Sequence, residues 1–473
     1  MDRLNPLDAS FIDVEDGDQR ASMAIALIAV FEGPVPSYDE FLAFLTGRLP
    51  LVPRYRQKLR QVPFRLGPPV WVDDPHFDLR YHLRQTALPG PGGDEQLSRL
   101  VARVMGQRLD RDYPLWEYWL VTGLAGDRWA VITKVHHCMV DGVSGTDMYR
   151  VIFDASPEPS APAVDDRVVS AEPSDLALAA QALMDTLLLP VREAAALREA
   201  LSRPGYLAAQ ATDTVRALVK LAASAHQATA SSLIGPIGQQ RRYTVARASL
   251  SEVKMIKREF GATVNDVVLA AISSGFRALL LTRGEQPEPL MVPTMVPVSV
   301  RGKGEEGSYG NRVSALTADL PVHIADPVER LTAIMTQLSD LKATKAATAG
   351  ESLVSLGRYT PFPVASLAVR LGSRLPQREI ATVATNIPGP RQPLYCIGRR
   401  LVEMIPYVPI SATVRTVVSI FSYCDELCFG ITGDYETTPD LDVLAGGIEN
   451  GVAELKAAAG HRDAALRNGQ NPA

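Results

Sequence analysis

The sequence has little cysteine and no excess of positive charge. Its four cysteines, Cys138, Cys396, Cys424 and Cys428, are too few among 473 residues for a disulfide framework, and they favour a reducing compartment such as the cytosol. Cys424 and Cys428 lack a second pair of ligands, so we do not expect a zinc site. The 48 basic and 53 acidic side chains give a net charge of −5, which argues against binding along a nucleic-acid backbone.

Long apolar runs are also absent. The longest one near the N-terminus, Met23 to Phe31, has about half of the ~20 residues that a membrane-spanning helix needs, and it indicates a buried strand. The N-terminus shows no basic region followed by an apolar stretch and a cleavage site, so we expect the mature chain to begin at Met1. Hydrophobic residues make up 46% of the chain and charged residues 21%, which predicts a packed core in about two or three domains.

Composition divides the chain into two lobes. Strand-like runs such as Arg128 to Val135 occur beside helical periodicity, as in Glu95 to Leu109, and this mixture is typical of α/β folds. Proline, serine, alanine and acidic residues then crowd residues 155–175 and predict a solvated linker. The expected units are an N-terminal lobe at 1–175, an Ala- and Leu-rich helical connector at 176–238, a C-terminal lobe at 239–460 and a mobile tail at 461–473.

One short segment carries the chemistry. The strand that ends near Val135 is followed by His136 and His137, and then by Asp141 and Gly142, in the pattern HHxxxDG. An imidazole has a reference pKa of about 6.5, so it can take a proton from a hydroxyl and return one to a leaving group near neutral pH. We expect Asp141 to be structural, fixing the turn by an ion pair with a distant arginine. Gly142 fits where the backbone turns sharply or leaves room for a ligand.

Other uses of these residues agree less well with the spacing. Adjacent residues of a strand face opposite sides, so at most one of His136 and His137 is expected to serve the same pocket. Paired histidines can bind metal, but the spacing of the helical zinc motif is absent and no third ligand is near. Cys138 could be a thiol nucleophile, but as the immediate neighbour of His137 it is expected to point away.

Further blocks occur in order along the chain. They are Leu4 to Phe11, Pro114-Leu115-Trp116, Asn265-Asp266, Val296 to Arg301 with Gly310 to Ser314, and Thr385 to Pro390. With HHxxxDG, they resemble the bacterial wax ester synthase/acyl-CoA:diacylglycerol acyltransferase family of the chloramphenicol acetyltransferase-like superfamily, from residue 4 to about 455. The resemblance implies an α/β fold of two lobes with mixed sheets, joined by a helical connector, with the active site in a channel between them.

The resemblance also implies a reaction, in which a fatty acyl group moves from coenzyme A to the hydroxyl of diacylglycerol or of a long-chain alcohol. His137 would be the general base and His136 a supporting residue, while Asp141 remains structural. No cofactor or metal is implied beyond acyl-CoA as a substrate. The residues implied at the substrate channel or lobe interface are Asn265, Asp266, Pro114, Leu115, Trp116 and Ser299.

The donor that stabilises the oxyanion is not defined by the motif. Asn265 and Ser299 are candidates, although each residue type more often caps a helix or sits in a strand. A membrane surface is a further expectation, because a lipid acceptor has to be reached without a spanning helix. The basic run Arg54 to Arg60 and the connector helices could contact lipid, or could be a solvated face and ordinary packing. The expected location is cytoplasmic, peripheral on the inner face of the plasma membrane or on lipid droplets.

Two other functions compete with this one. The first is a condensation-type transferase that takes its acyl group from a carrier protein. The second is a lipid-binding protein whose tunnel has lost turnover. An intact HHxxxDG favours the enzymes, since a non-catalytic tunnel needs no base at a strand end.

Overall fold

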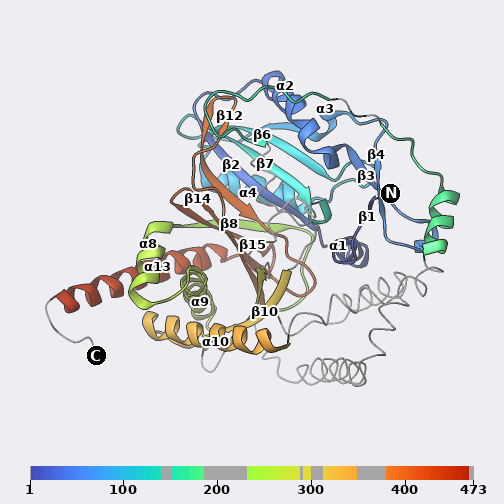
Figure 1. The fold of residues 1–473 in the computed structure, drawn as a ribbon. Helices are drawn as coiled ribbons and strands as arrows, with labels where there is room; N and C mark the ends of the chain where they lie inside the picture. Colours follow the sequence, from blue (N-terminus) through green and yellow to red (C-terminus); the bar gives the residue numbers. More distant parts are fainter. Residues whose placement is uncertain are drawn as a thin grey trace, which may run out of the picture.

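The structure is a computed structural model that describes residues 2–139, 152–165, 167, 169–185, 232–287, 291–299, 313–348 and 380–467. These residues form two six-stranded sheets and one three-stranded sheet, in two lobes that lie one above the other (Figure 1). Both large sheets mix parallel and antiparallel neighbours. The predicted α/β fold with mixed sheets is therefore confirmed.

The sheet of the N-terminal lobe has β7 (Arg128–His136) near its centre, between β2 (Ala24–Glu32) and β6 (Trp116–Leu124). Strands β2 and β7 were expected from their apolar pattern, and nearly every side chain of β7 is buried. Helices α2 (Tyr38–Arg48) and α3 (Leu79–His82) cover the outer face (Figure 1). In spatial order the strands are β12 (Tyr395–Cys396), β13 (Arg399–Tyr407), β2 (Ala24–Glu32), β7 (Arg128–His136), β6 (Trp116–Leu124) and β5 (Leu83–Ala87).

The sheet of the C-terminal lobe is covered on one face by four helices (Figure 1). In spatial order its strands are β10 (Val313–Leu320), β9 (Val292–Ser299), β11 (Thr382–Ile387), β14 (Thr416–Tyr423), β15 (Glu426–Asp434) and β8 (Arg241–Ser249). The helices are α8 (Leu250–Phe260), α9 (Val264–Thr282), α10 (Pro327–Thr348) and α13 (Leu441–Arg467). The opposite face turns toward the N-terminal lobe through contacts of β14 and β15 with β13.

The N-terminal sheet is not contiguous in sequence, because the segment after residue 239, expected to form the C-terminal lobe, also supplies two of its strands. Strands β12 and β13 come from the segment assigned to the C-terminal lobe, yet β13 pairs antiparallel with β2 and completes the N-terminal sheet. The physical reason is that the apolar strand β2 would otherwise leave an edge of unpaired backbone groups. The C-terminal part of the chain therefore builds part of the lobe that carries the histidines.

The lobes meet where β13 contacts β15. A Cβ atom added at Gly430 would lie 1.8 Å from the Pro406 carbonyl oxygen, so only glycine fits there. The same carbonyl accepts hydrogen bonds from the hydroxyls of Tyr243, at 2.6 Å, and Ser419, at 3.2 Å. Helix α4 (Asp94–Gly106) also contacts β8 of the other lobe. These contacts fix the relative position of the two sheets.

Helix α9 is long and apolar enough to cross a membrane, but it is a core helix of the C-terminal lobe. It packs against α13, α10 and α8. Small residues allow the closest of these approaches, because a Cβ atom at Gly447 on α13 would lie 2.7 Å from the Gly275 Cα atom on α9. Most of the apolar surface of α9 is thus used within the protein.

The basic run Arg54 to Arg60 begins in the 3₁₀ turn Pro53–Arg56 and continues into β3 (Gln57–Arg60), which forms a small sheet with β4 (Val70–Asp73) and β1 (Asp2–Arg3). Its cations are neutralised by acidic residues, mostly from the segment that was expected to be a solvated linker. The ion pairs are Arg54 with Asp2, Arg56 with Asp165, Lys58 with Glu172, and Arg60 with Glu172 and Asp175. The segment therefore runs along the N-terminal lobe, and these cations are not free for lipid head groups.

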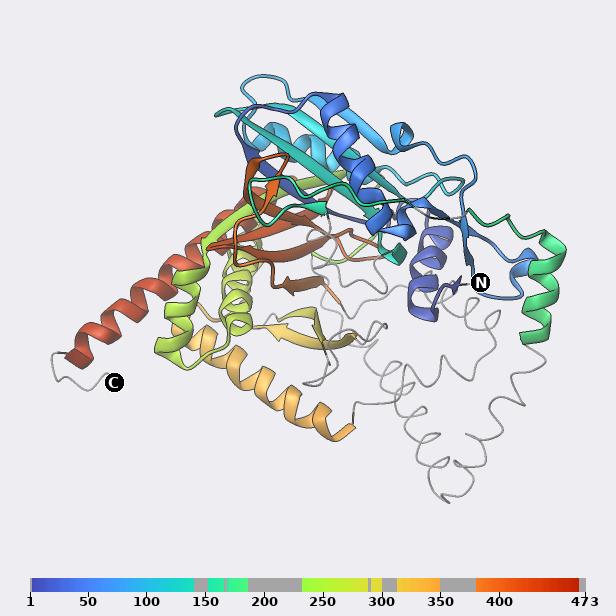
Figure 2. The ribbon, with the colours of Figure 1, turned by 45° about the horizontal axis from the view of Figure 1, so that its top comes forward.

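The expected connector is described only at its two ends. Residues 175–185 form a helix, as predicted, which packs Leu178 and Ala182 against the small sheet (Figure 2). Residues 232–238 contain no helix. The rest of the connector lies outside the described residues.

Candidate active site

The two histidines stand where the central strand of the N-terminal sheet ends. His136 is the last residue of β7, and His137 opens the 3₁₀ turn η4 (His137–Met139). The main chain holds both in place, because the His136 N–H donates to the Leu115 carbonyl at 2.9 Å and the His137 N–H donates to the Met23 carbonyl at 3.0 Å. Each histidine is thus tied to a different neighbour of β7.

Helix α1 (Pro6–Gly17) brings two side chains onto the histidine pair. It begins at Asn5, whose side chain accepts the Asp8 N–H at 2.8 Å, and it packs against η4. Phe11 stacks on His137 with ring centroids 4.0 Å apart. One helical turn later, Glu15 places its Oε1 3.4 Å from Nε2 of His136.

Both histidines contact α1, although adjacent residues of a strand were expected to face opposite sides. That at most one of them serves the substrate pocket stays a prediction. The alternation of side chains holds only within a strand, and β7 ends at His136. The 3₁₀ turn redirects the next side chain, so that His136 and His137 both contact the same face of α1.

His136 is almost fully buried, with 1% of its surface exposed. Its Nδ1 accepts the Cys138 N–H at 3.2 Å and lies 3.0 Å from the Cys138 Sγ atom. A ring that accepts at Nδ1 carries its proton on Nε2, and Nε2 faces Glu15. The arrangement suits a supporting residue rather than one that meets substrate.

Glu15 is a buried carboxylate with several donors. The Met23 N–H donates to Oε1 at 2.6 Å, and Arg111 donates to Oε2 at 2.9 Å. Burial by itself would raise the pKa of Glu15, but the contacts with His136 and Arg111 outweigh it and lower the pKa to about 2. The carboxylate is therefore ionised throughout the physiological range.

His137 keeps part of its surface accessible although protein surrounds its ring. Burial lowers the pKa of His137 to about 4; repulsion by His136 acts in the same direction, and a hydrogen bond to its own main chain opposes them. The ring is thus neutral at pH 7. Nδ1 is buried without a hydrogen-bond partner among the described residues, and the neutral ring keeps one lone pair, as a general base needs.

The block Pro114-Leu115-Trp116 lies at the start of β6 in the N-terminal core. Trp116 is 1% exposed, stacks between Tyr55 and His82 at 4.6 and 4.5 Å, and donates to the Tyr55 carbonyl at 2.8 Å. Its contacts are those of a core residue rather than of a channel wall. Leu115 contributes through its carbonyl, which positions His136.

The three site residues predicted in the C-terminal lobe lie on two elements, Asn265 and Asp266 at the start of α9 and Ser299 at the end of β9. Asp266 forms a capping box at the start of α9: it accepts the Thr263 N–H at 2.7 Å, and the Thr263 hydroxyl accepts the Asp266 N–H at 3.2 Å. Asn265 is half-buried on the same first turn. Ser299 is the last residue of β9, where it pairs with Val313. None of the contacts among described side chains joins Asn265 or Asp266 to the histidines.

Two predicted residues, Asp141 and Gly142, lie outside the described residues, so their roles stay predictions. The expected channel also remains a prediction. A small hollow of about 10 Å³ does lie at the lobe junction, but its lining is not the histidine pair. It is formed by Ile28, Leu97, Val101, Tyr243, Val245 and Ile405, with Asp94, Ser98 and Arg247 at its polar side.

Metal or thiol chemistry finds little support in the described part of the chain. There, no group of three or more His, Cys, Asp or Glu side chains is arranged around a metal position. Cys138 is buried, and burial raises the pKa of its thiol well above the usual value, so the thiolate is disfavoured.

Sequence reasoning missed Phe11, Glu15 and Arg111. The first two are four residues apart and so lie on one face of α1, but this helix was not predicted from the sequence. No pattern indicated that this face lies against residues 136 and 137, because that contact arises only from the tertiary fold.

Comparisons with known proteins identify the family of the chain. The family described as wax ester synthase/diacylglycerol acyltransferase catalytic domain matches residues 4–268, and the WS/DGAT C-terminal domain matches residues 309–456. The protein of Mycobacterium tuberculosis strain H37Rv named "Probable diacyglycerol O-acyltransferase tgs1" is 40% identical over 472 residues, which cover 99% of each chain. A second protein of that strain, also named as a diacylglycerol O-acyltransferase, is 34% identical over 97% of this chain and 91% of its own.

Solved structures extend the comparison. The wax ester synthase/diacylglycerol acyltransferase from Marinobacter aquaeolei VT8 is 26% identical, covers 97% of this chain and 100% of its own, and gives a TM-score of 0.69. The starter condensation domain of rhizomide synthetase, at 16% identity and a TM-score of 0.57 over 97% of this chain and 94% of its own, shares the fold. From the family match over most of its length and its 40% identity to a curated relative, the chain belongs to the wax ester synthase/diacylglycerol acyltransferase family.

Proposed function

We propose that this protein is an acyl-CoA:diacylglycerol O-acyltransferase that forms triacylglycerol, with wax ester synthesis as a second activity. The observation that carries the proposal is His137, a neutral and partly accessible imidazole at the end of β7 in a chain of this acyltransferase family. The names of the relatives support diacylglycerol as the acceptor.

The reaction follows from the state of His137. Its Nε2 takes the proton of the acceptor hydroxyl as that oxygen attacks the thioester carbonyl. The tetrahedral intermediate collapses, the C–S bond breaks, and the imidazolium returns its proton to the coenzyme A thiolate. Because burial holds the pKa of His137 at about 4, the imidazolium is a strong acid for this second transfer. His137 is regenerated without a covalent acyl-enzyme.

This chemistry needs a base, a thioester and a hydroxyl. We propose that acyl-CoA is a substrate and that no metal or redox cofactor takes part. Dialysis against a chelator is then expected to leave the rate of transfer unchanged, and a loss of activity that added metal restores would contradict the proposal.

We further propose a cytoplasmic protein that meets its lipid substrate at a membrane or lipid-droplet surface through an apolar patch. The patch consists of Phe64, Leu176, Leu183 and Met184, all exposed; Phe64 is 90% exposed. It lies on the Pro63–Arg65 turn and on helix 175–185, which both pack over the small sheet (Figure 2). Phe64→Ser is expected to reduce co-flotation with phosphatidylcholine vesicles containing diacylglycerol, and equal flotation of the variant and wild type would contradict this docking.

The substrate proposal is tested with purified wild-type protein and radiolabelled palmitoyl-CoA. Diacylglycerol, monoacylglycerol and hexadecanol are offered in parallel, and an acyl carrier protein loaded with palmitate is offered as an alternative donor. We expect triacylglycerol from palmitoyl-CoA, with weaker wax ester formation. Transfer only from the carrier protein would favour the condensation-type function. Retention of the acyl ligand without any product would favour a lipid-binding protein.

A further inference from the structure

We infer that Glu15 is a positioning residue of the active site, which holds the tandem histidines in their working geometry through contacts with His136 and with the backbone that anchors His137. As far as activity is concerned, this inference rests on the proposed function. Glu15 lies outside HHxxxDG, and only 2% of its side chain is exposed.

The Glu15 carboxylate contacts the ring of His136 and also Met23, the residue whose carbonyl anchors His137. Oε1 of Glu15 lies 3.4 Å from Nε2 of His136 and also accepts the Met23 N–H at 2.6 Å. The Met23 carbonyl in turn accepts the His137 N–H at 3.0 Å. Moving Glu15 would therefore disturb the ring of one histidine and the main-chain anchor of the other.

His136 also forms a hydrogen bond with the turn that carries His137. Its Nδ1 accepts the Cys138 N–H at 3.2 Å, so the ring bridges Glu15 and the residue that follows the base. A carboxylate facing Nε2 selects the tautomer with the proton on Nε2, and this tautomer keeps Nδ1 free to accept. With a different tautomer or ring orientation, the turn that carries His137 would lose one of its hydrogen bonds.

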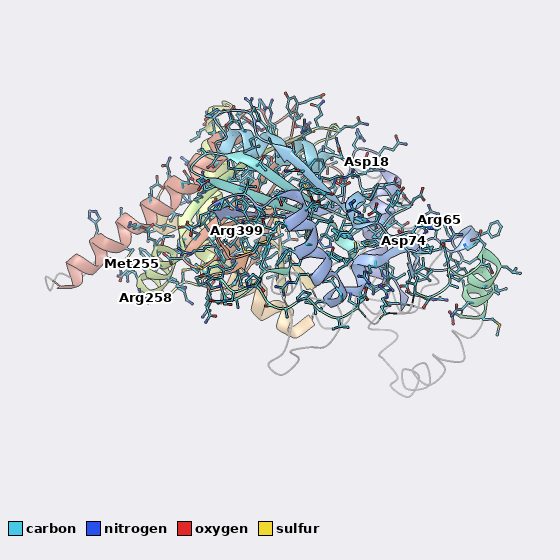
Figure 3. All side chains as sticks on the ribbon, turned by 90° about the horizontal axis from the view of Figure 1, so that it is seen from above. Asp18, Arg65, Asp74, Met255, Arg258 and Arg399 are labelled. Atoms are coloured by element: carbon cyan, nitrogen blue, oxygen red, sulfur yellow. The ribbon has the colours of Figure 1, made fainter. Side chains whose placement is uncertain are left out.

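Helix α1 is also held in place by arginine contacts that do not involve His136. Arg111 donates to Glu15 and also to Asp16, and Arg65 pairs with Asp16 at 2.9 Å on the more exposed side of the helix. Arg108 donates to the main-chain carbonyls of Glu15, Asp18 and Ala21 at the end of α1 (Arg65 and Asp18 are labelled in Figure 3). The helix is thus attached by several arginines without the contact between Glu15 and His136.

A buried carboxylate is also a costly way to hold a helix. Desolvation opposes its charge, and an apolar side chain of similar size could fill the same space. Glu15 accepts hydrogen bonds from the Met23 N–H and from Arg111. Its third contact is with His136, the residue next to the proposed base. Positioning of the histidines explains why a charge is kept at this place.

The test compares Glu15→Gln and Glu15→Asp with the control Asp16→Asn, which changes the neighbouring partner of Arg111 without touching His136. Glu15→Gln removes the charge, and Glu15→Asp keeps it but withdraws it from His136. For both Glu15 variants we expect kcat to fall by about 10- to 100-fold while KM for palmitoyl-CoA stays within about two-fold of wild type. Asp16→Asn is expected to keep wild-type kcat.

A second readout does not depend on activity. The protein is labelled with ¹⁵N-histidine, and the signals of its seven histidines are assigned with single substitutions. In wild type we expect His136 to show one tautomer protonated at Nε2, and in both Glu15 variants a mixture or the opposite tautomer.

These outcomes separate the two claims. If the tautomer changes but wild type transfers no acyl group, the positioning role stands and the proposed function fails. Folded Glu15 variants with unchanged His136 signals and wild-type kcat would overturn the inference. Failure of both variants to fold, with Asp16→Asn stable, would also overturn it, because Glu15 would then be a residue of the core.

Discussion

The ring of Phe11 lies over the ring of His137, with centroids 4.0 Å apart and planes inclined by 32°. The contact joins the first helix of the chain to the residue that opens the turn after β7. It excludes water from one face of the imidazole, and burial is the main reason that the pKa of His137 falls to about 4. Helix α1 therefore helps to keep His137 neutral.

The first prediction concerns Phe11→Ala. Removal of the ring admits water, so the pKa of His137 should rise from about 4 toward its reference value near 6.5. A base acts only when deprotonated, so the acid limb of kcat/KM should move to higher pH. Between about pH 5 and 8 the wild-type profile should be nearly flat, whereas that of the variant should fall below about pH 6.5. Phe11→Leu keeps an apolar cover and should resemble wild type; identical profiles for all three proteins would refute this role.

The second prediction concerns stability in acid. Folded His137 takes up its proton at a pKa of about 4, while an unfolded histidine takes it up near 6.5. The unfolded state thus binds more protons between these values, and the free energy of unfolding should decrease as pH falls from about 6.5 to about 4. Urea unfolding at several pH values should show a smaller decrease for His137→Asn. An equal decrease would mean that His137 does not contribute.

Parts of this fold could be predicted from the sequence because their signals are local. The apolar runs that became β2 and β7 and the periodic segment that became α4 all carry their own pattern. The placement of β13 beside β2 has no such signal, since it depends on pairing between segments at opposite ends of the chain. For the same reason, HHxxxDG indicated His137, the proposed base, but not Glu15 or Phe11.

The third prediction concerns Trp116, which the family resemblance placed at a channel or lobe interface. Its stacking between Tyr55 and His82 and its hydrogen bond to the Tyr55 carbonyl indicate a core role. Trp116→Phe should lower the free energy of unfolding by about 1–3 kcal/mol while activity per folded molecule stays near wild type. Trp119→Phe, at a half-buried site on the same strand, should cost less. A stable Trp116 variant with a strongly raised KM would instead favour a channel wall.

The fourth prediction uses two adjacent glycines of α13. Gly447→Ala would place Cβ 2.7 Å from the Gly275 Cα atom, so it should destabilise the protein by about 1–3 kcal/mol. A Cβ atom at Gly446 meets nothing within 4 Å, so Gly446→Ala should stabilise the helix by about 0.5–1 kcal/mol. Thermal melting measures both. Similar effects of the two substitutions would contradict the close packing of α9 and α13.

The most direct test of the account is the rate of acyl transfer from palmitoyl-CoA to diacylglycerol by His137→Ala, beside the control His76→Ala at an exposed histidine. Loss of a general base should lower the rate by about 10²- to 10⁴-fold. The melting temperature should stay close to that of wild type, and His76→Ala should keep full activity. A folded His137→Ala protein that makes triacylglycerol at the wild-type rate would contradict the assignment of His137 as the base.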